Sequence, residues 1–313
     1  MRYWMVILFI LLAGCSGDAP APTSVAERDP DKPPVVVYSA YSDTTYLPAL
    51  FKTFTDQTGI PVVVRHRSDE DNLADMAAKS GSQPADVLMT RSVWAIWQAA
   101  EEGLLRPLPT SSTARSIADG LQDPDGKWVA LTVREVGVQV ADGVDMPPGF
   151  LELADPAYQG RLCLTTSGIH QNRVLVAHLV DAFGARETEL AVRGWVSNLA
   201  LPPFDSESEL QKAFAEGRCQ IGVRTGPNNP AFRSSGSLLE IEAVGIGRHA
   251  RSPDDAATLI DWMLSDDFLS RHASLDSGMP ATADAFRQLE LDMSTLGFLY
   301  EDAIRLVERA RWY

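Results

Sequence analysis

Two short stretches of the chain run from an apolar strand into a polar turn, and both could place ligand-binding groups. The first leads from Cys163 into residues 165–168, which read Thr-Thr-Ser-Gly. The second leads from Cys219 into residues 226–229, which read Gly-Pro-Asn-Asn. In open α/β sheets, ligands bind beyond the carboxyl ends of the strands. The hydroxyl and amide groups of these turns are therefore candidates for binding a small solute.

Sequence patterns typical of catalysis are absent from the chain. It has no Gly-x-Ser-x-Gly, no His-Glu-x-x-His, no Gly-Lys-Ser/Thr phosphate loop and no Cys-x-x-Cys. The five histidines show no paired metal-binding spacing. We therefore expect a binding protein that is not an enzyme and has no resident cofactor.

Composition and charge limit the class of partner. The chain has 313 residues, of which 45% are hydrophobic and 22% charged, as in soluble globular proteins. This length suits two lobes of ordinary size. The formal net charge of −15 argues against nucleic acid, whose partners carry a basic footprint.

The N-terminus predicts export and a lipid anchor. Residues 4–13 form an apolar run that is shorter than the roughly 20 residues needed to span a bilayer, but it suits a secretion signal. Residues 12–15 (Leu-Ala-Gly-Cys) resemble a bacterial lipobox, so we expect residues 1–14 to be a signal peptide and Cys15 to carry the lipid. Residues 15–34 have the composition of a disordered tether. The predicted location is the periplasm or cell envelope, anchored to a bacterial membrane.

The two remaining cysteines, Cys163 and Cys219, leave two alternatives open. An oxidising compartment allows a disulfide between them. Because each lies in a short strand pattern, two separate buried thiols are equally consistent with the sequence.

The elements that must position these groups alternate between strands and helices. Apolar, β-branched runs near residues 35–39, 62–64 and 85–89 are separated by helical patterns, which predicts a parallel, doubly wound sheet. Residues 128–140 are extended, with an interruption at Arg134-Glu135, and are long enough to cross between lobes; residues 238–247 would return. Further helices are expected at 172–183, 187–199, 210–216, 254–264, 266–275 and 281–311.

Several segments resemble the periplasmic substrate-binding proteins of ABC importers, specifically the iron(III)-binding branch. They occur in order between about residues 35 and 280: Val-Tyr-Ser at 37–39, Phe-Thr-Asp-Gln-Thr-Gly-Ile-Pro-Val at 54–62, Pro-Ala-Asp-Val at 84–87, Gly-Leu-Leu-Arg-Pro-Leu at 103–108, Trp-Val-Ala-Leu at 128–131 and Leu-Ala-Asp-Pro at 153–156. The resemblance implies an α/β, type II two-lobed clamshell, each lobe a mainly parallel sheet flanked by helices, with a two-strand hinge. One lobe would comprise residues 35–134 with 245–282, and the other 135–244 with 283–313. It also implies a monomer that works with an ABC permease and ATPase.

Few of that family's iron-ligand positions hold a matching residue in this chain. Where such proteins commonly have a histidine after the first strand, this chain has Tyr41 and Ser42, and the family's acidic ligand would fall at Glu70 or Asp71. The family's two adjacent tyrosines would fall at residues 226–229, which contain none. A ferric ion favours anionic oxygen donors. We therefore do not expect a standard tyrosine-ligated iron(III) site.

The part of the family site that holds an anion is better matched. The resemblance places an anion on a Thr-Ser-Gly turn, and a helix N-terminus with an arginine nearby favours such a ligand. The expected ligand-binding residues are Tyr41, Ser42, Asp71, Arg134, Thr166, Ser167, Gly168, Arg224, Thr225, Asn228 and Asn229.

These observations predict a lipoprotein that delivers a small anion or phosphonate-like solute to an ABC importer by closure of its lobes. One alternative is a ferric-ion or ferric-chelate binding protein with remodelled ligands. A second alternative, from another class, is a signalling lipoprotein that presents its bound state to a membrane receptor.

Overall fold

The computed structural model describes residues 33–40, 46–78, 84–109, 117–225, 238–275, 278–282 and 293–313. The predicted signal peptide and lipidation site therefore lie outside the described residues, as does nearly all of the tether. The same holds for four of the expected ligand-binding residues, namely Tyr41, Ser42, Asn228 and Asn229.

The first lobe opens with the predicted alternation of strands and helices. Its elements are β1 (Val35–Ser39), α1 (Leu47–Thr58), β2 (Val62–His66), α2 (Asp69–Ala77), β3 (Val87–Thr90), α3 (Val93–Glu101) and β4 (Leu105–Arg106). Strand β1 pairs in parallel with β2 on one side and β3 on the other. Pro48 lies in the first turn of helix α1, where no helical N–H is needed. The helix ends at Gly59, whose φ is 73°.

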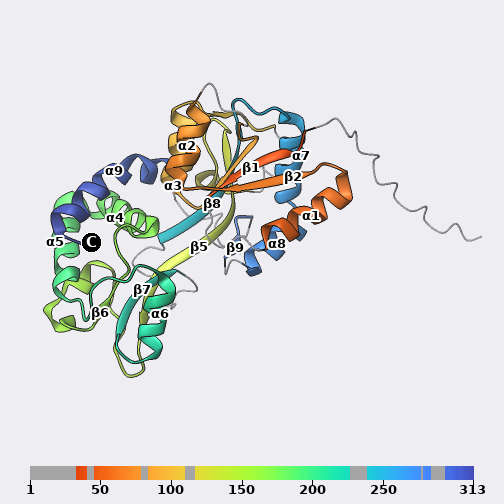
Figure 1. Ribbon diagram of the computed structural model, residues 1–313. Coiled ribbons are helices and arrows are strands. Elements are labelled where there is room, and N and C mark those ends of the chain that lie inside the picture. Colours follow the sequence, from red (N-terminus) through yellow and green to blue (C-terminus); the bar gives the residue numbers. More distant parts are fainter. Residues whose placement is uncertain are drawn as a thin grey trace, which may run out of the picture.

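Two long strands connect the lobes (Figure 1). Strands β5 (Trp128–Val140) and β8 (Leu238–Gly247) pair antiparallel. The end of β8 lies beside β3 of the first lobe, whereas the end of β5 lies beside β7 of the second. The expected interruption at Arg134-Glu135 is wrong: β5 is continuous there, because both residues pair with β8, and its irregularity lies between Ala130 and Thr132.

The second lobe contains a disulfide, which was one of the two alternatives that the sequence allowed. Its elements are the short helices η3 (Leu151–Ala154) and η4 (Pro156–Tyr158), followed by β6 (Leu162–Cys163), α4 (His170–Phe183), α5 (Ala185–Ser197), α6 (Glu207–Ala215) and β7 (Ile221–Thr225). Cys163 and Cys219 are joined, with their Cα atoms 5.8 Å apart. The bond ties β6 to the start of its parallel neighbour β7 and confirms the disulfide alternative.

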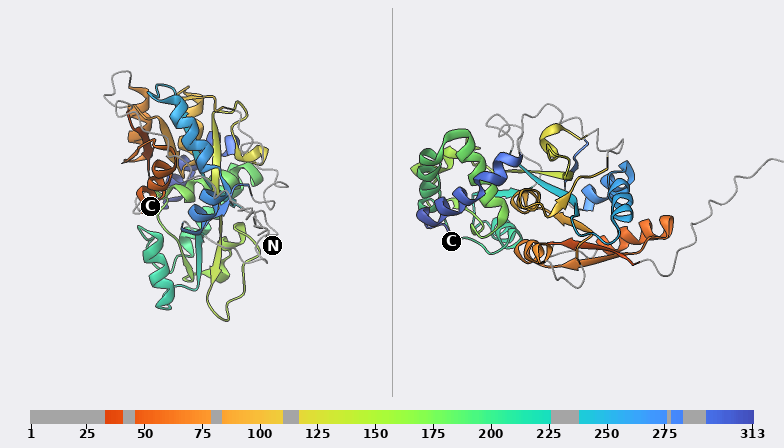
Figure 2. Two further views of the ribbon diagram at one scale, coloured as in Figure 1. Left: turned by 90° about the vertical axis from the view of Figure 1, so that its right-hand side faces the viewer. Right: turned by 90° about the horizontal axis from the view of Figure 1, so that it is seen from above.

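The remaining helices divide between the lobes. Helices α7 (Pro253–Met263) and α8 (Asp266–Leu275) follow β8 back into the first lobe, where β9 (Met279–Pro280) pairs with β5. Helix α9 (Met293–Ala310) packs against α4 and α5 and also against α3. Figure 2 shows the green α4 and α5 with the dark-blue α9 at one end of the molecule, and the orange strands with α7 and α8 at the other.

Asp86, in the Pro-Ala-Asp-Val segment, is a structural residue of the first lobe. Its side chain is buried, and its carboxylate accepts hydrogen bonds from three backbone N–H groups. Val36 donates to Oδ2 over 2.8 Å, and Arg251 and Ser252 donate to Oδ1 over 2.6 and 3.1 Å. A carboxylate at a helix N-terminus is favourable, so Asp86 fixes the start of α7 against β1.

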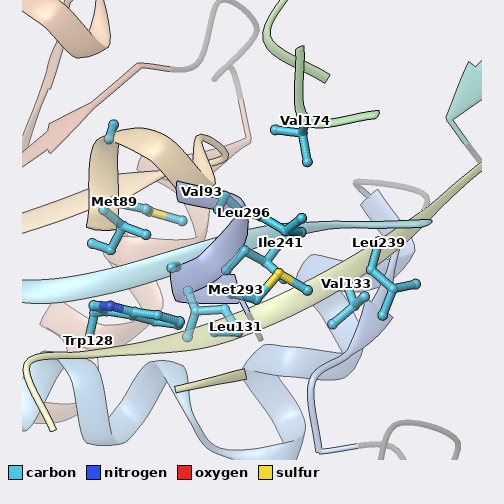
Figure 3. Packing of buried hydrophobic residues seen from close by; sticks show 14 of the residues in the cluster. Met89, Val93, Trp128, Leu131, Val133, Val174, Leu239, Ile241, Met293 and Leu296 are labelled. Carbon is cyan, nitrogen blue, oxygen red and sulfur yellow. The ribbon is translucent and has the colours of Figure 1, made fainter. Parts of the chain in front are cut away.

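One hydrophobic cluster extends through both lobes and the strands between them. In Figure 3, Met293 and Leu296 of α9 lie beside Ile241 of β8 and Leu131 of β5. No helix in the part of the chain that the structure describes is long and apolar enough to cross a membrane. The predicted lobe boundaries, at 134/135 and 244/245, fall inside the two connecting strands and remain predictions.

Candidate solute-binding site

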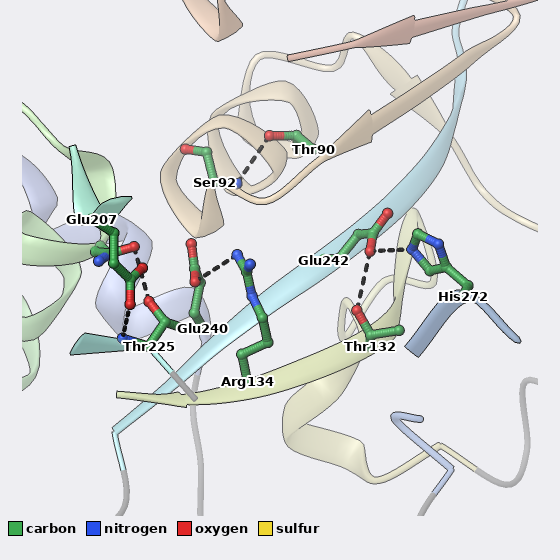
Figure 4. Close-up of polar contacts among 10 residues, drawn as sticks. Thr90, Ser92, Thr132, Arg134, Glu207, Thr225, Glu240, Glu242 and His272 are labelled. Atoms are coloured by element: carbon green, nitrogen blue, oxygen red, sulfur yellow. Dashed lines mark hydrogen bonds and ion pairs between the residues drawn. The ribbon is translucent and has the colours of Figure 1, made fainter. Parts of the chain in front are cut away.

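The connecting strands present a ladder of polar side chains on one face (Figure 4). Alternate residues of a strand share a face, and the register pairs Thr132 with Glu242 and Arg134 with Glu240. Arg134 Nη2 lies 2.7 Å from Glu240 Oε2. Glu242 Oε2 accepts a hydrogen bond from Thr132 Oγ1 over 3.0 Å and lies 2.5 Å from His272 Nε2. We call these five residues the β5–β8 ladder.

Charges from both lobes meet at Glu240. Burial raises the pKa of this carboxyl group, and the guanidinium groups of Arg134 and Arg91 partly oppose the shift. Glu207 of the second lobe adds to it. Arg134 therefore compensates a buried carboxylate in this structure, and its role as a ligand contact stays a prediction.

The first lobe contributes Thr90, Ser92 and Asp69. Thr90 Oγ1 donates to Asp69 Oδ1 over 2.7 Å and accepts from the Ser92 N–H over 2.9 Å. Burial raises the pKa of Asp69 to about 6.

The expected acidic residue, Asp71, is exposed in the first turn of α2. Asp69 has the inward position because it lies three, four and seven residues before the buried Asn72, Leu73 and Met76. This helical spacing was the sequence signal that could have identified it.

The second lobe contributes Thr225, at the end of β7. Its N–H donates to Glu207 Oε1 over 3.0 Å, and its Oγ1 donates to Gln171 Oε1 over 3.1 Å. The preceding residue, Arg224, is half-buried and makes no side-chain hydrogen bond or ion pair to any other described residue. Of the two arginines expected to bind an anionic ligand, Arg224 is therefore the better candidate.

Three helices meet at His170, a residue that the sequence analysis did not select. Its Nδ1 lies 2.7 Å from the hydroxyl of Tyr300 on α9 and 3.3 Å from Ser92 Oγ at the start of α3. Its Nε2 is buried and has no hydrogen-bond partner among the described residues. Burial, with the charge of Arg173, lowers the pKa of His170 to about 3, so the imidazole is neutral near pH 7. We call His170, Ser92 and Tyr300 the α3–α4–α9 junction.

The Thr-Thr-Ser-Gly turn precedes α4 but does not supply its N-cap residue. The N-cap residue is Ile169, which has no side chain that could accept a hydrogen bond. Ser167 Oγ donates to the carbonyl of Trp312 over 2.5 Å, and the N–H of Thr166 donates to Phe204 O. Gly168 is exposed. The turn therefore anchors the C-terminus, and Ser167 would have to give up this bond to donate to a ligand.

Around Glu240 the structure brings together Arg134, Glu207 and Thr225, with Thr90 on the first lobe (Figure 4). The polar residues that the sequence analysis did not select are Asp69, His170, Glu207 and Glu240. Asp71 is exposed on α2, and Ser167 is bonded to the C-terminal segment. No group of three or more His, Cys, Asp or Glu side chains within the described ranges could hold a metal ion.

The known proteins to which the chain is similar are of one kind. No family model matches the chain. It is 25% identical to iron uptake protein A1 of Synechocystis, over 96% of this chain and 93% of the relative. It is 21% identical to the Fe(3+)-binding periplasmic protein of Serratia marcescens, over 73% of each chain. These relatives are binding and uptake proteins and not enzymes, which agrees with the absence of catalytic patterns.

Solved structures share the fold. The ferric binding protein of Campylobacter jejuni superimposes with a TM-score of 0.78 at 18% identity, over 89% of this chain and all of the other. FutA (IdiA) of Trichodesmium, solved in complex with iron and citrate ligands, superimposes with a TM-score of 0.74 at 23% identity, over 90% of this chain and all of the other. The protein therefore has the type II, two-lobed fold of periplasmic binding proteins, and it resembles the iron(III)-binding branch of the solute-binding proteins.

Proposed function

We propose that the protein binds ferric iron outside the cytoplasm and delivers it to an ABC importer. Its sequence similarity extends over nearly the whole chain to proteins named for iron uptake and over most of it to one named for Fe(3+) binding. This proposal replaces the small-anion or phosphonate prediction, which the comparisons do not support, and adopts the ferric alternative.

We further propose that the iron is bound as a complex with a small polycarboxylate. Ferric iron favours anionic oxygen ligands, and the chain lacks tyrosines at residues 226–229. An organic acid could supply those oxygens. The pair of unpartnered groups supports this form of the cargo: Arg224 suits a carboxylate, and His170 Nε2 suits either the metal or an acid hydroxyl. One structural relative was solved with both iron and citrate.

Lobe closure would then couple binding to recognition by the importer. His170 Nε2 is shielded from solvent in the present arrangement, so the lobes must separate before a cargo reaches it. A cargo that contacts Thr90 or Arg91 on one lobe and His170, Arg224 or Thr225 on the other favours the closed form by its differential affinity. Taking the protein from mostly open to mostly closed needs about 5.5 kcal/mol of such preference.

A thermal-shift and calorimetric comparison tests the cargo. The purified protein is titrated with ferric citrate, citrate alone, ferric iron with a weak chelator, phosphate and a simple phosphonate. We expect stabilisation by ferric citrate of about 2.7 kcal/mol at a hundredfold excess over Kd, with little effect of citrate alone. Equal stabilisation by phosphate or a phosphonate without iron would overturn the proposal. Stabilisation by every ferric form alike would retain iron and refute the chelate.

The periplasmic location and the lipid anchor are part of the same proposal. A relative is named as periplasmic, and the lipobox-like residues end at Cys15. Replacing Cys15 by Ser should move the protein from the membrane fraction to the soluble fraction without changing ferric citrate binding. Retention of the Cys15→Ser variant in the membrane fraction would refute lipidation at this residue.

A further inference from the structure

Helix α9 contacts helices of both lobes. Its buried residues recur with helical spacing along its whole length: Met293, Leu296, Gly297, Tyr300, Ala303, Leu306, Val307 and Ala310. The beginning of α9 faces α3 of the first lobe, whereas the remainder packs on α4 and α5 of the second (Figure 1). It therefore lies across the line along which the two lobes would move.

The contact with the first lobe is close and specific. A Cβ atom at Gly297 would lie 2.5 to 2.8 Å from atoms of Trp97, so only glycine permits this approach of α9 to α3. One turn later, Tyr300 stacks on Trp94 with ring centroids 5.5 Å apart and an interplanar angle of 21°. Both aromatic partners belong to α3.

The other end of α9 is fixed to the second lobe. Trp312 is buried, its Nε1 donates to Thr165 O over 2.9 Å, and its own carbonyl accepts from Ser167. Its ring also lies edge-on to Trp195 of α5. Arg309 Nε adds an ion pair to Glu189 of α5 at 2.9 Å. The second-lobe end is thus held by several polar anchors.

The α3–α4–α9 junction joins these elements by hydrogen bonds. His170 of α4 contacts the hydroxyl of Tyr300 on α9 and Ser92 Oγ at the N-cap of α3. The junction is therefore assembled only while the first lobe, the second lobe and α9 are in their present relative positions.

We propose that α9 is a strap, a third connection between the lobes in addition to β5 and β8, and that Tyr300 is its latch. Because Trp312 holds α9 to the second lobe, the contacts of Gly297 and Tyr300 with α3 are those that separate when the lobes move apart. The strap thereby sets the open–closed balance of the protein without cargo. Contacts present in one conformation only shift the population toward that conformation.

The test measures the distance between the lobes in the protein without cargo, so it does not depend on which cargo is bound. Spin labels are placed at two exposed positions, Thr258 on α7 and Lys212 on α6, in the full chain carrying Cys15→Ser. Distance distributions are compared for the parent, Tyr300→Leu, which removes the ring that stacks on Trp94, and Gly297→Ala. The matched control is Tyr158→Leu, which removes an aromatic ring from η4 in the second lobe.

Loss of the Tyr300 ring should raise the ratio of separated to present conformations about three- to tenfold, as expected for one aromatic pair. Gly297→Ala should shift it further, and Tyr158→Leu should leave it unchanged. If Gly297→Ala does not fold, Tyr300→Leu alone decides. An unchanged distribution in Tyr300→Leu, or the same shift in Tyr158→Leu, would overturn the strap.

Discussion

The side chains of two histidines have similar hydrogen bonding but lie in different parts of the molecule. His272 belongs to the β5–β8 ladder, where its Nε2 faces Glu242 and its ring is fully buried against Phe268 and Tyr46. His170 belongs to the α3–α4–α9 junction, between elements of both lobes. In each ring one nitrogen has a partner and the other has none among the described residues.

The difference lies in what can reach the unpartnered nitrogen. The ladder is closed by β5, β8 and α8, all of which belong to one packed unit. The junction is closed on one side by Ser92 of the first lobe, so separation of the lobes would open it. The buried charges of the ladder therefore pair with one another along the connecting strands, whereas the unpartnered nitrogen of the junction is the group that the proposed cargo would contact.

The largest expected effect comes from breaking the ladder. Arg134→Ala leaves Glu240 buried without its ion-pair partner, so we expect a loss of about 3–5 kcal/mol in the free energy of unfolding, measured by urea denaturation. The double variant Arg134→Met/Glu240→Leu should recover most of that loss, because no unpaired charge remains. If the double variant is as unstable as Arg134→Ala, charge compensation is not the role of this pair.

A smaller effect is expected on binding when the junction is changed. His170→Asn keeps a polar group near the position of Nδ1 but removes Nε2. We expect the affinity for ferric citrate to fall about tenfold, or roughly 1.4 kcal/mol, while the urea midpoint stays nearly unchanged. Calorimetric titration of both proteins measures this. An unchanged Kd would exclude Nε2 as a contact of the cargo.

The next effect depends on pH and concerns Asp69. Its pKa is about 6 in the folded protein and about 3.9 in an unfolded chain. The folded state therefore holds more protons between these values, and stability falls as the pH rises through that window. Asp69→Asn cannot ionise, so it should be more stable than the parent by about 1–2 kcal/mol at pH 7.5 and similar at pH 4. Thermal melts at both pH values test this, with the exposed Asp71→Asn as control. A stability difference that does not change with pH would contradict the assignment.

The smallest effect is expected for an ion pair outside both regions. Arg305 and Asp302 lie 2.6 Å apart on α9, with 59% and 52% of their side chains exposed. Exposed pairs contribute about 0–1 kcal/mol, so Arg305→Ala should shift the urea midpoint hardly at all. A loss comparable to that of Arg134→Ala would show that burial is not what separates the two pairs.

Much of the fold could be predicted because local patterns agree with it. The apolar run at Val35–Ser39 and the helix that ends at Gly59 follow from side-chain periodicity and backbone preference alone. The contacts of the candidate site could be predicted less far. The family resemblance places an acidic ligand at Glu70 or Asp71, but several acids lie together at the start of α2, and only packing shows that Asp69 faces inward. The resemblance also selects Ser167, whose hydroxyl group has as its partner a carbonyl 145 residues further along the chain.

By itself, the sequence determined the order of strands and helices, the two long extended segments and the absence of tyrosines at residues 226–229, because these depend on neighbouring residues or on composition. The tertiary structure alone decided that Cys163 and Cys219 are joined, that Arg134 neutralises Glu240, and that His170 meets α3 and α9. Each of those outcomes is a contact between distant parts of the chain. Such contacts depend on how whole elements pack, and no local pattern of side chains specifies that packing.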